Sequence, residues 1–287
     1  MILSMTGFAA VAEELPGVAL AVELRSVNHR YLDLSVRLPD ELRQLEPALR
    51  ERIAAELKRG KVECRIAINR TPGAGTVAVD RDRVAELARA AAEVRRAVPD
   101  AAPLTAAEIL RWPGVMVEAS MPADRLAERV HALADAALAD LAAARAREGD
   151  KLKALMLARC ADVEAQVARV APRVPAIHAA FLEKLGARLR EAGLDPNEDR
   201  LKQELAMFAT KSDVAEEVAR LVTHVAEVRR VLNAGGSAGK RLDFLAQELH
   251  REANTLGSKS VDAELSQAAL ELKVLIEQMR EQVQNIE

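Results

Sequence analysis

Residues 18–39, VALAVELRSVNHRYLDLSVRLP, contain two runs in which every second residue is apolar. A period of two is typical of strands that bury one face and expose the other. The polar segment SVNHR between the runs has the composition of a connection. The apolar residues are Val18, Leu20, Val22 and Leu24 in the first run, and Leu32, Leu34, Val36 and Leu38 in the second. The stretch therefore predicts two half-buried strands joined by a polar connection.

The neighbouring segments extend these strands into a small α+β module. Residues 39–60 predict a helix. Asp40 can cap its first turn, Pro47 can restart it as a first helical residue, and Gly60 can end it. Residues 61–70 alternate again, and residues 5–10 add another expected strand. We expect at least one helix to cover the resulting sheet.

Beyond the turn-rich residues 71–76, almost all of the chain has helical character. Thr105 and Glu108 form a capping-box pattern. Residues 123–171 are rich in Ala, Arg and Leu and contain no proline, which predicts long helices with Gly149 as a weak point.

The predicted fold class is α+β, with a small amino-terminal sheet-and-helix domain followed by a mainly α-helical region. The amino-terminal domain is expected over residues 1–72, with an extension to about residue 120 left open. Residues 121–198 are expected to form a long helical arm. Residues 199–287 are expected to form a carboxyl-terminal helical domain that carries the polar motifs.

Composition limits the function classes. The formal charge of the 287 residues is −3, from 41 basic and 44 acidic side chains, which argues against coating nucleic acid through bulk charge but permits a local basic patch. Two cysteines without motif spacing suggest reduced thiols. The first ten residues lack a secretory leader pattern, and no segment has the ~20 apolar residues of a membrane helix. We expect a soluble cytoplasmic protein without a membrane partner.

Two helices near the carboxyl end carry polar rows beside their apolar stripes. Both rows repeat at intervals of three or four residues, so each lies on one helical face. The segment GGSAG, residues 235–239, would join the two helices as an antiparallel pair and bring the rows near each other. The first row is Asp213, Glu217, Arg220 and His224, and the second is Glu248, Arg251 or Glu252, Thr255 and Lys259.

Carboxylates and an imidazole on such a seam suit a hard divalent cation, Mg²⁺ or Mn²⁺, better than zinc. A cation of this kind can activate water and stabilise charge on a phosphoryl group. Charges at helical spacing are also common on solvated faces and in ion pairs within one helix. His224, next to the apolar stripe, could equally be a core or interface histidine.

A second polar cluster lies in the first predicted connection. Arg and Lys contact phosphates, while His and Tyr can stack on bases exposed in single-stranded RNA. A plain turn with solvated charges is the alternative interpretation. The cluster comprises Arg25, Asn28, His29, Arg30 and Tyr31, with Lys58, Arg59 and Lys61 beyond the predicted helix.

Several long segments resemble the YicC/YloC family of bacterial proteins. At the amino end these are MTGFA, ELRSVNHRYLDLSVRLP and RGKVE. At the carboxyl end they are RLKQELAMFATKSDVAEEVARLVTHV, GKRLDFLAQELHREANTLGSKS and ELKVLIEQMREQVQNIE. The resemblance implies an endoribonuclease that depends on a divalent metal, usually Mn²⁺, and that assembles as a ring-like homo-oligomer, a hexamer.

The resemblance places functional weight on the acidic and basic residues inside the matching motifs. From helical geometry, Glu217, Glu248 and Glu252 are the expected metal ligands, with His224 as a ligand or general acid/base. Mn²⁺ is the preferred cofactor, with Mg²⁺ as an alternative. The expected RNA contacts are Arg25, His29, Arg30, Arg220, Arg251, Asn254 and Lys259.

Two other functions remain open at this point. The chain could be an oligomeric RNA-binding clamp or adaptor without catalytic activity, since it has no compact catalytic signature. It could also be a structural protein whose polar rows only set the packing of its helices.

Overall fold

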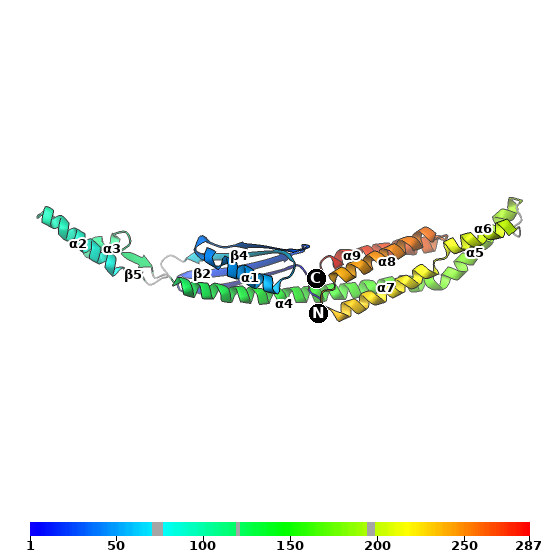
Figure 1. Ribbon diagram of the computed structural model, residues 1–287, viewed down its shortest axis with the longest axis horizontal. Helices are drawn as coiled ribbons and strands as arrows, with labels where there is room; N and C mark the ends of the chain where they lie inside the picture. The colour runs from blue at the N-terminus through cyan, green and yellow to red at the C-terminus, as the bar shows by residue number, and fades with distance from the viewer. Residues whose placement is uncertain (71–76, 119–120, 194–198) are drawn as a thin grey trace. The chain divides into compact units, whose positions relative to one another are not determined.

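The computed structural model describes residues 1–287 except 71–76, 119–120 and 194–198 (Figure 1). The chain divides into two compact units. Unit 2 comprises Phe8–Leu141, and unit 1 combines Met1–Gly7 with Ala142–Glu287. A sheet covered by helices is followed by a mainly helical region, so the predicted α+β fold class is confirmed. The three domain boundaries expected from the sequence follow a different division and stay a prediction.

The sheet of unit 2 has four strands. They are β1 (Gly7–Leu15), β2 (Val18–Val27), β3 (Leu32–Arg37) and β4 (Gly60–Arg70), in the spatial order β1-β2-β4-β3. β2 pairs antiparallel with β4, and β3 pairs parallel with β4. The alternating residues of β2 and β4 are buried on one face, as their period of two predicted. All four predicted strands are therefore present.

Between β3 and β4 the predicted helix forms, but its ends differ from the prediction. A 3₁₀ turn, η1 (Asp40–Leu45), leads into α1 (Glu46–Glu56), and neither is capped by a side chain. Gly60 does not end the helix but starts β4, with φ +108°. A Cβ at this position would lie 3.3 Å from the carbonyl oxygen of Val27, so glycine allows the close entry of β4 beside β2.

The core of unit 2 lies between the sheet, α1 and the first part of α4 (Ala123–Val170). Leu20 and Leu24 from the sheet, Leu49 from α1 and Leu141 from α4 are almost fully buried there. Burial of each such side chain contributes about 1.5–3 kcal/mol relative to exposure. This packing holds the β2–β3 connection at one end of the sheet.

Residues 77–118 form a separate small motif of unit 2. It contains β5 (Val77–Val79), α2 (Arg81–Ala97), α3 (Ala106–Arg111) and β6 (Met116–Glu118). The capping box of Thr105 and Glu108 is confirmed. The β5–β6 pairing was not predicted, since strands of three residues carry too little pattern. Neither α2 nor α3 has a buried residue in the described part of the chain.

Helix α4 continues through the 3₁₀ turn η2 (Ala171–Arg173) into α5 (Val174–Glu191). Gly149 does not interrupt α4, contrary to the expectation of a weak point. A Cβ at Gly149 would collide with the carbonyl oxygen of Ile2. The glycine therefore lets the first residues of the chain lie directly on α4 within unit 1.

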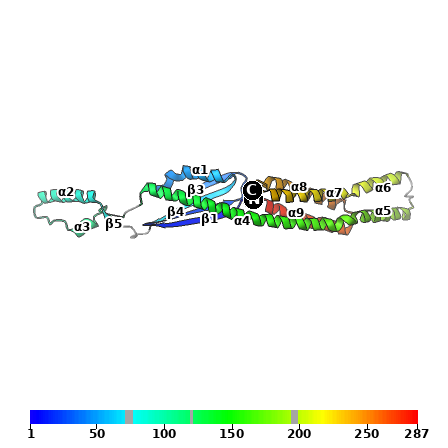
Figure 2. The ribbon, with the colours of Figure 1, turned by 90° about the horizontal axis from the view of Figure 1, so that it is seen from below.

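The remaining helices of unit 1 are α6 (Asp199–Ser212), α7 (Ala215–Ala234), α8 (Gly239–Lys259) and α9 (Ala263–Val283). Helices α7, α8 and α9 lie alongside the second part of α4 in both ribbon views (Figure 1 and Figure 2), and their buried side chains form one core. A β-bridge joins Ser4 to Ile286, and the buried Arg145 donates a hydrogen bond to the carbonyl of Ser4 and pairs with Glu287. Both chain ends are thus part of this unit's core.

Candidate metal centre on the α7–α8 seam

The local sequence explains why α7 and α8 form an antiparallel hairpin. Gly235 and Gly236 adopt positive φ angles of +71° and +81°, which end α7 and allow the chain to reverse. The apolar stripes of both helices enter the core, so the polar rows beside them meet at its border. The buried stripe residues are Leu221, Val225, Val228 and Leu232 on α7, and Leu242, Leu245, Leu249 and Leu256 on α8.

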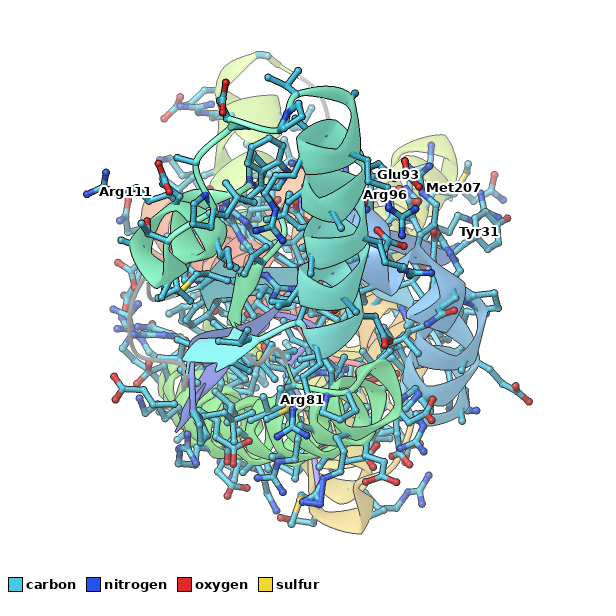
Figure 3. All side chains as sticks on the ribbon, turned by 90° about the vertical axis from the view of Figure 1, so that its left-hand side faces the viewer. Tyr31, Arg81, Glu93, Arg96, Arg111 and Met207 are labelled. Carbon is cyan, nitrogen blue, oxygen red and sulfur yellow. The ribbon has the colours of Figure 1, made fainter. Side chains whose placement is uncertain are left out.

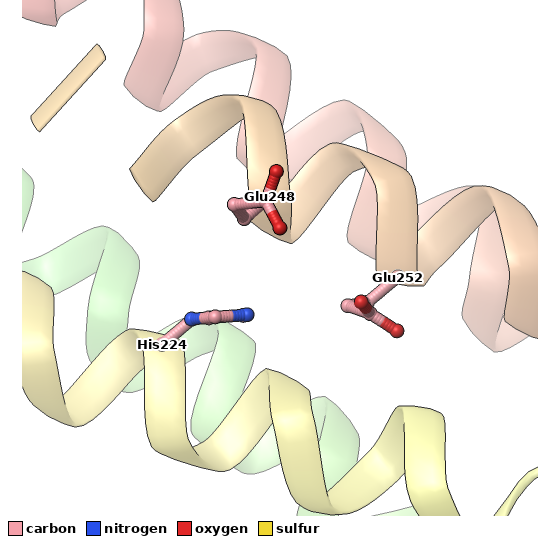
Figure 4. Close-up of side chains that lie close together, drawn as sticks. All are labelled: His224, Glu248 and Glu252. Carbon is pink, nitrogen blue, oxygen red and sulfur yellow. The ribbon is translucent and has the colours of Figure 1, made fainter. Parts of the chain in front are cut away.

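His224, Glu248 and Glu252 converge on this seam (Figure 4). One potential ligand atom from each residue lies within 4.8 Å of the others. The two glutamates are one turn apart on α8, and the imidazole reaches toward them from α7. Atoms bound at about 2.1 Å to one cation lie at most about 4.2 Å apart, so small side-chain rotations close the site.

The donor set fits a divalent cation of the Mn²⁺ or Mg²⁺ type. One imidazole nitrogen and two carboxylate groups are ligands that Mn²⁺ accepts, and three protein ligands leave positions for water or substrate. Glu252 is only 3% exposed, while His224 and Glu248 are partly exposed. A nearly buried carboxylate requires a positive partner, and a bound cation would be one.

Arg220 is the charged neighbour of this triad. Its Nη1 lies 3.5 Å from Oε1 of Glu252, and its Nη2 pairs with Glu216. The hydrogen bond to Glu216 is the main cause that raises the pKa of Arg220. Half of the Arg220 side chain is exposed. The guanidinium can therefore remain beside Glu252 or turn toward a phosphate in solvent.

Glu217, expected as a ligand, has a different partner in the structure. Its Oε1 accepts a hydrogen bond from Nζ of Lys259 at 2.8 Å, and Lys259 also donates to the carbonyl of Asp213 at 3.1 Å. Its Oε2 is buried and has no hydrogen-bond partner within the described residues. Metal ligation by Glu217 and RNA contact by Lys259 stay predictions, while the geometry brings together the other three expected residues.

The remaining expected RNA contacts of α8 lie on its outer face. Arg251 is exposed, and Nδ2 of Asn254 donates to the imidazole of His250 at 3.1 Å. The hydroxyls of Thr255 and Ser258 donate to the carbonyls of Arg251 and Thr255 within the same helix. These hydroxyls are thus bonded to their own helix, which explains how poor helix formers are accommodated.

In unit 2, the expected RNA contacts Arg25, His29 and Arg30 are exposed near one end of the sheet. The guanidinium of Arg30 lies 5.2 Å from the ring centre of Tyr31, within the range of a cation–π contact. Nδ1 of His29 lies 2.9 Å from the carbonyl oxygen of Tyr31. The Tyr31 side chain, 63% exposed, points outward (Figure 3). An aromatic ring and cations are thus available together on this surface.

A polar triad on a helical hairpin, beside basic side chains and within an α+β fold, is an arrangement suited to metal-assisted chemistry on an anionic substrate. The chain matches two protein families, described as "Endoribonuclease YicC-like, N-terminal region" over residues 2–154 and "Endoribonuclease YicC-like, C-terminal" over residues 170–287. It therefore belongs to the YicC-like endoribonuclease family.

Two curated relatives are similar over their whole length. One is a protein of Haemophilus influenzae named "Probable endoribonuclease YicC", which is 38% identical over 287 residues and covers 100% of both chains. The other, from Clostridioides difficile, has the same name, is 30% identical over 294 residues and also covers 100% of both chains. Among the described helices, none is both long and apolar enough to cross a membrane.

Proposed function

We propose that this protein is an endoribonuclease that hydrolyses RNA phosphodiester bonds with the help of a divalent cation, preferably Mn²⁺ and alternatively Mg²⁺. Membership of the family and the names of its relatives support activity on RNA. The observation that carries the metal dependence is the convergence of His224, Glu248 and Glu252 on one seam. We place the protein in the cytoplasm, which agrees with its two free, buried cysteines.

The residues of the seam have separate tasks in this proposal. Glu248, Glu252 and His224 hold the cation, which when bound supplies an activated water and positive charge at the phosphoryl group. If His224 is not a ligand, its partly exposed ring can instead transfer a proton to or from the reacting oxygens. Arg220 stands beside Glu252 and can bind a phosphate oxygen of the substrate.

RNA binding extends over further basic residues. Arg251 and Lys259 on α8, together with Arg25, His29 and Arg30 in unit 2, are proposed phosphate contacts. Tyr31 can stack on an unpaired base, because its ring is exposed and the guanidinium of Arg30 lies beside it. Asn254 adds an amide next to these cations on α8.

We further propose that the protein acts as a homo-oligomer, a hexamer. Residues 77–118 support this proposal, because they expose large apolar side chains around a single buried one, Val115, among those described. A motif without its own core needs a partner surface to bury these groups. The exposed side chains are Val79, Val94, Val98, Leu104, Leu110, Trp112 and Met116.

A non-catalytic RNA clamp is the competing function. It is favoured by the ion pairs of Arg220 and Lys259, which already compensate part of the charge on Glu252 and Glu217. In that case the seam would be a packing register with RNA-binding cations beside it.

Cleavage of end-labelled RNA by the purified protein distinguishes the two functions. We expect fragments in Mn²⁺ and none in EDTA, with 5′-phosphate and 3′-hydroxyl ends, the common outcome of metal-assisted hydrolysis. Protein with both Glu248→Gln and Glu252→Gln, purified in parallel, controls for contaminating nuclease. Fragments with 2′,3′-cyclic phosphate ends formed in EDTA would refute metal dependence, and absence of cleavage with intact RNA binding would favour the clamp.

A further inference from the structure

Unit 1 contains a pocket that is lined mainly by α5 and none of whose lining residues belongs to the triad. It has a volume of about 580 Å³ and lies between α5 and the turn before α9, formed by Val261 and Asp262. This volume is within the usual range of ligand pockets, about 300–1,000 Å³. We call it the α5 pocket. Its main lining side chains are Ile177, Phe181 and Leu185, which are apolar, and Arg173, Lys184 and Arg188, which are cationic.

The helical period explains this mixed lining. Positions 177, 181, 184, 185 and 188 recur at intervals of three or four, so they share one face of α5. Phe181 and Ile177 are only partly buried. The face thus combines a partly buried aromatic ring with one cation three residues further along and another seven residues, about two turns, further along.

The charges of the α5 pocket are unequally compensated. Arg173 forms an ion pair with Glu264 in the first turn of α9. The Asp262 carboxylate accepts hydrogen bonds from the backbone N–H groups of Glu264 and Leu265, so it is occupied as the cap of α9. Within the part of the chain that the structure describes, Lys184 and Arg188 form no ion pair. The pocket is therefore an anion-attracting surface.

We infer that the α5 pocket binds a segment of single-stranded RNA, with a base against Phe181 and neighbouring phosphates at Lys184 and Arg188. The two cations are one turn apart, about 6 Å along the helix axis, so each can contact a different phosphate. A base can reach a ring inside a pocket only when it is unstacked, which excludes the interior of a duplex. The inference rests on the proposed function for RNA as the ligand, and adds the strand state and a second contact region.

Binding without cleavage tests the inference. Fluorescence anisotropy with a labelled oligouridylate of 20 nucleotides, in EDTA, compares the full-length protein with Arg188→Glu and Lys184→Glu. We expect each change to weaken binding about tenfold and to reduce the slope of log affinity against log salt by about 0.7 or more. Arg190→Glu is the matched control, because Arg190 is exposed on α5 but does not line the pocket. It should change affinity less than about twofold.

The aromatic contact has its own pair of variants. Phe181→Leu keeps an apolar side chain but loses the flat ring, and should weaken binding about fivefold or more. Phe181→Tyr keeps the ring and should bind within about twofold of the wild type. If Phe181→Leu does not fold, as its circular dichroism would show, the surface variants Lys184→Glu and Arg188→Glu still decide the question.

Photo-cross-linking locates the bound strand directly. Oligonucleotides with 5-iodouridine should cross-link to the peptide that contains Phe181, and a duplex of the same sequence should compete poorly. The inference is overturned if Lys184→Glu and Arg188→Glu bind like the Arg190→Glu control. It is also overturned if these variants change only the sedimentation coefficient, which would make the pocket an interface between copies of the chain.

The failure of this inference can be separated from the failure of the proposed function. Wild-type protein that cleaves RNA in Mn²⁺, while the pocket variants bind and cleave normally, would remove the pocket and keep the nuclease. A wild-type protein that binds RNA but never cleaves it, together with pocket variants that no longer bind RNA, would keep the pocket and remove the nuclease. Protein that binds no RNA would remove both.

Discussion

Nζ of Lys259 lies 2.8 Å from Oε1 of Glu217. The other oxygen of this carboxylate, Oε2, is buried without a hydrogen-bond partner among the described residues, so the ion pair is the main compensation for the negative charge of Glu217. Lys259→Met should therefore destabilise the protein by about 2–3 kcal/mol, less than for a fully buried pair because Lys259 is 30% exposed. Urea unfolding measures the loss. Adding Glu217→Gln should restore part of it, and an unchanged midpoint in Lys259→Met would contradict this account.

Substitution of a triad carboxylate should separate binding from chemistry. Glu252→Gln keeps the size and hydrogen-bonding capacity of the side chain but removes the charge that a divalent cation needs. We expect cleavage at low Mn²⁺ to fall roughly 100-fold, with partial rescue at high Mn²⁺ and nearly normal RNA binding.

Glu216→Gln is the control for this change. Glu216 also pairs with Arg220 but is exposed and lies outside the triad. It should retain activity and Mn²⁺ affinity, measured by titration calorimetry. Wild-type cleavage by Glu252→Gln at low Mn²⁺ would show that the triad is not the metal site.

Arg251→Ala should affect RNA rather than metal. The exposed guanidinium is not part of the triad, so its loss should leave Mn²⁺ affinity intact. RNA binding in EDTA should weaken, and its salt dependence should become flatter by about one unit of slope. Lys240→Ala, an exposed cation near the start of the same helix, is expected to have a smaller effect. Equal effects of the two variants would indicate only general charge attraction.

Gly149→Ala tests the close packing of the first residues on α4. Alanine favours a helix by about 1 kcal/mol over glycine, but its Cβ would collide with the carbonyl oxygen of Ile2. We expect a net destabilisation of about 1–3 kcal/mol, as for other overpacked sites.

Gly186→Ala is the matched control for this prediction, because among the described residues no atom outside its own helix lies within 4 Å of the added Cβ. It should stabilise α5 by about 0.5–1 kcal/mol. Thermal or urea unfolding should therefore give opposite signs for the two substitutions. A stabilising effect of Gly149→Ala, like that expected for Gly186→Ala, would mean that the Ile2 segment does not rest on α4 in solution.

Trp112 provides a reporter of assembly. It is the single tryptophan of the chain and is 52% exposed. If residues 77–118 form an interface between copies, its fluorescence should shift to shorter wavelengths as protein concentration rises. Leu110→Glu should prevent both the shift and the assembly seen by sedimentation, whereas Arg89→Glu on α2 should not. A wild-type monomer of 31.1 kDa at all concentrations, still active, would contradict the homo-oligomer.

The parts of the fold that were predicted correctly are those with a repeated pattern. Strands β2 and β4 were predictable because they bury one face, which gives their sequences a period of two. Helix α4 was predictable because its sequence is rich in residues of high helix propensity and contains no proline. The role of Gly60 and Gly149 could not be predicted, because each depends on a backbone segment that tertiary packing brings close. The β5–β6 strands were missed because three residues hold too few repeats.

The candidate site shows the same limit. Helical spacing predicted two polar rows and their approach, because position along a helix sets the face. It could not predict that Glu217 forms an ion pair with Lys259 while Glu252 lies near His224. These partners depend on the register of the α7–α8 hairpin. The α5 pocket was missed for another reason. Phe181, Lys184 and Arg188 have regular spacing, but the pocket is completed by Val261 and Asp262, which only tertiary packing brings beside α5.

The bridge between Ser4 and Ile286 has a consequence for synthesis on the ribosome. The hydrophobic core of unit 2 is built from residues within Phe8–Leu141, so this unit can fold while later residues are still being added. Unit 1 cannot, because Leu3 accepts a hydrogen bond from the N–H of Glu287, and such distant pairings form slowly. The segment Met1–Gly7 is therefore synthesised before unit 2 but can pair only after Ala142–Glu287 have been synthesised.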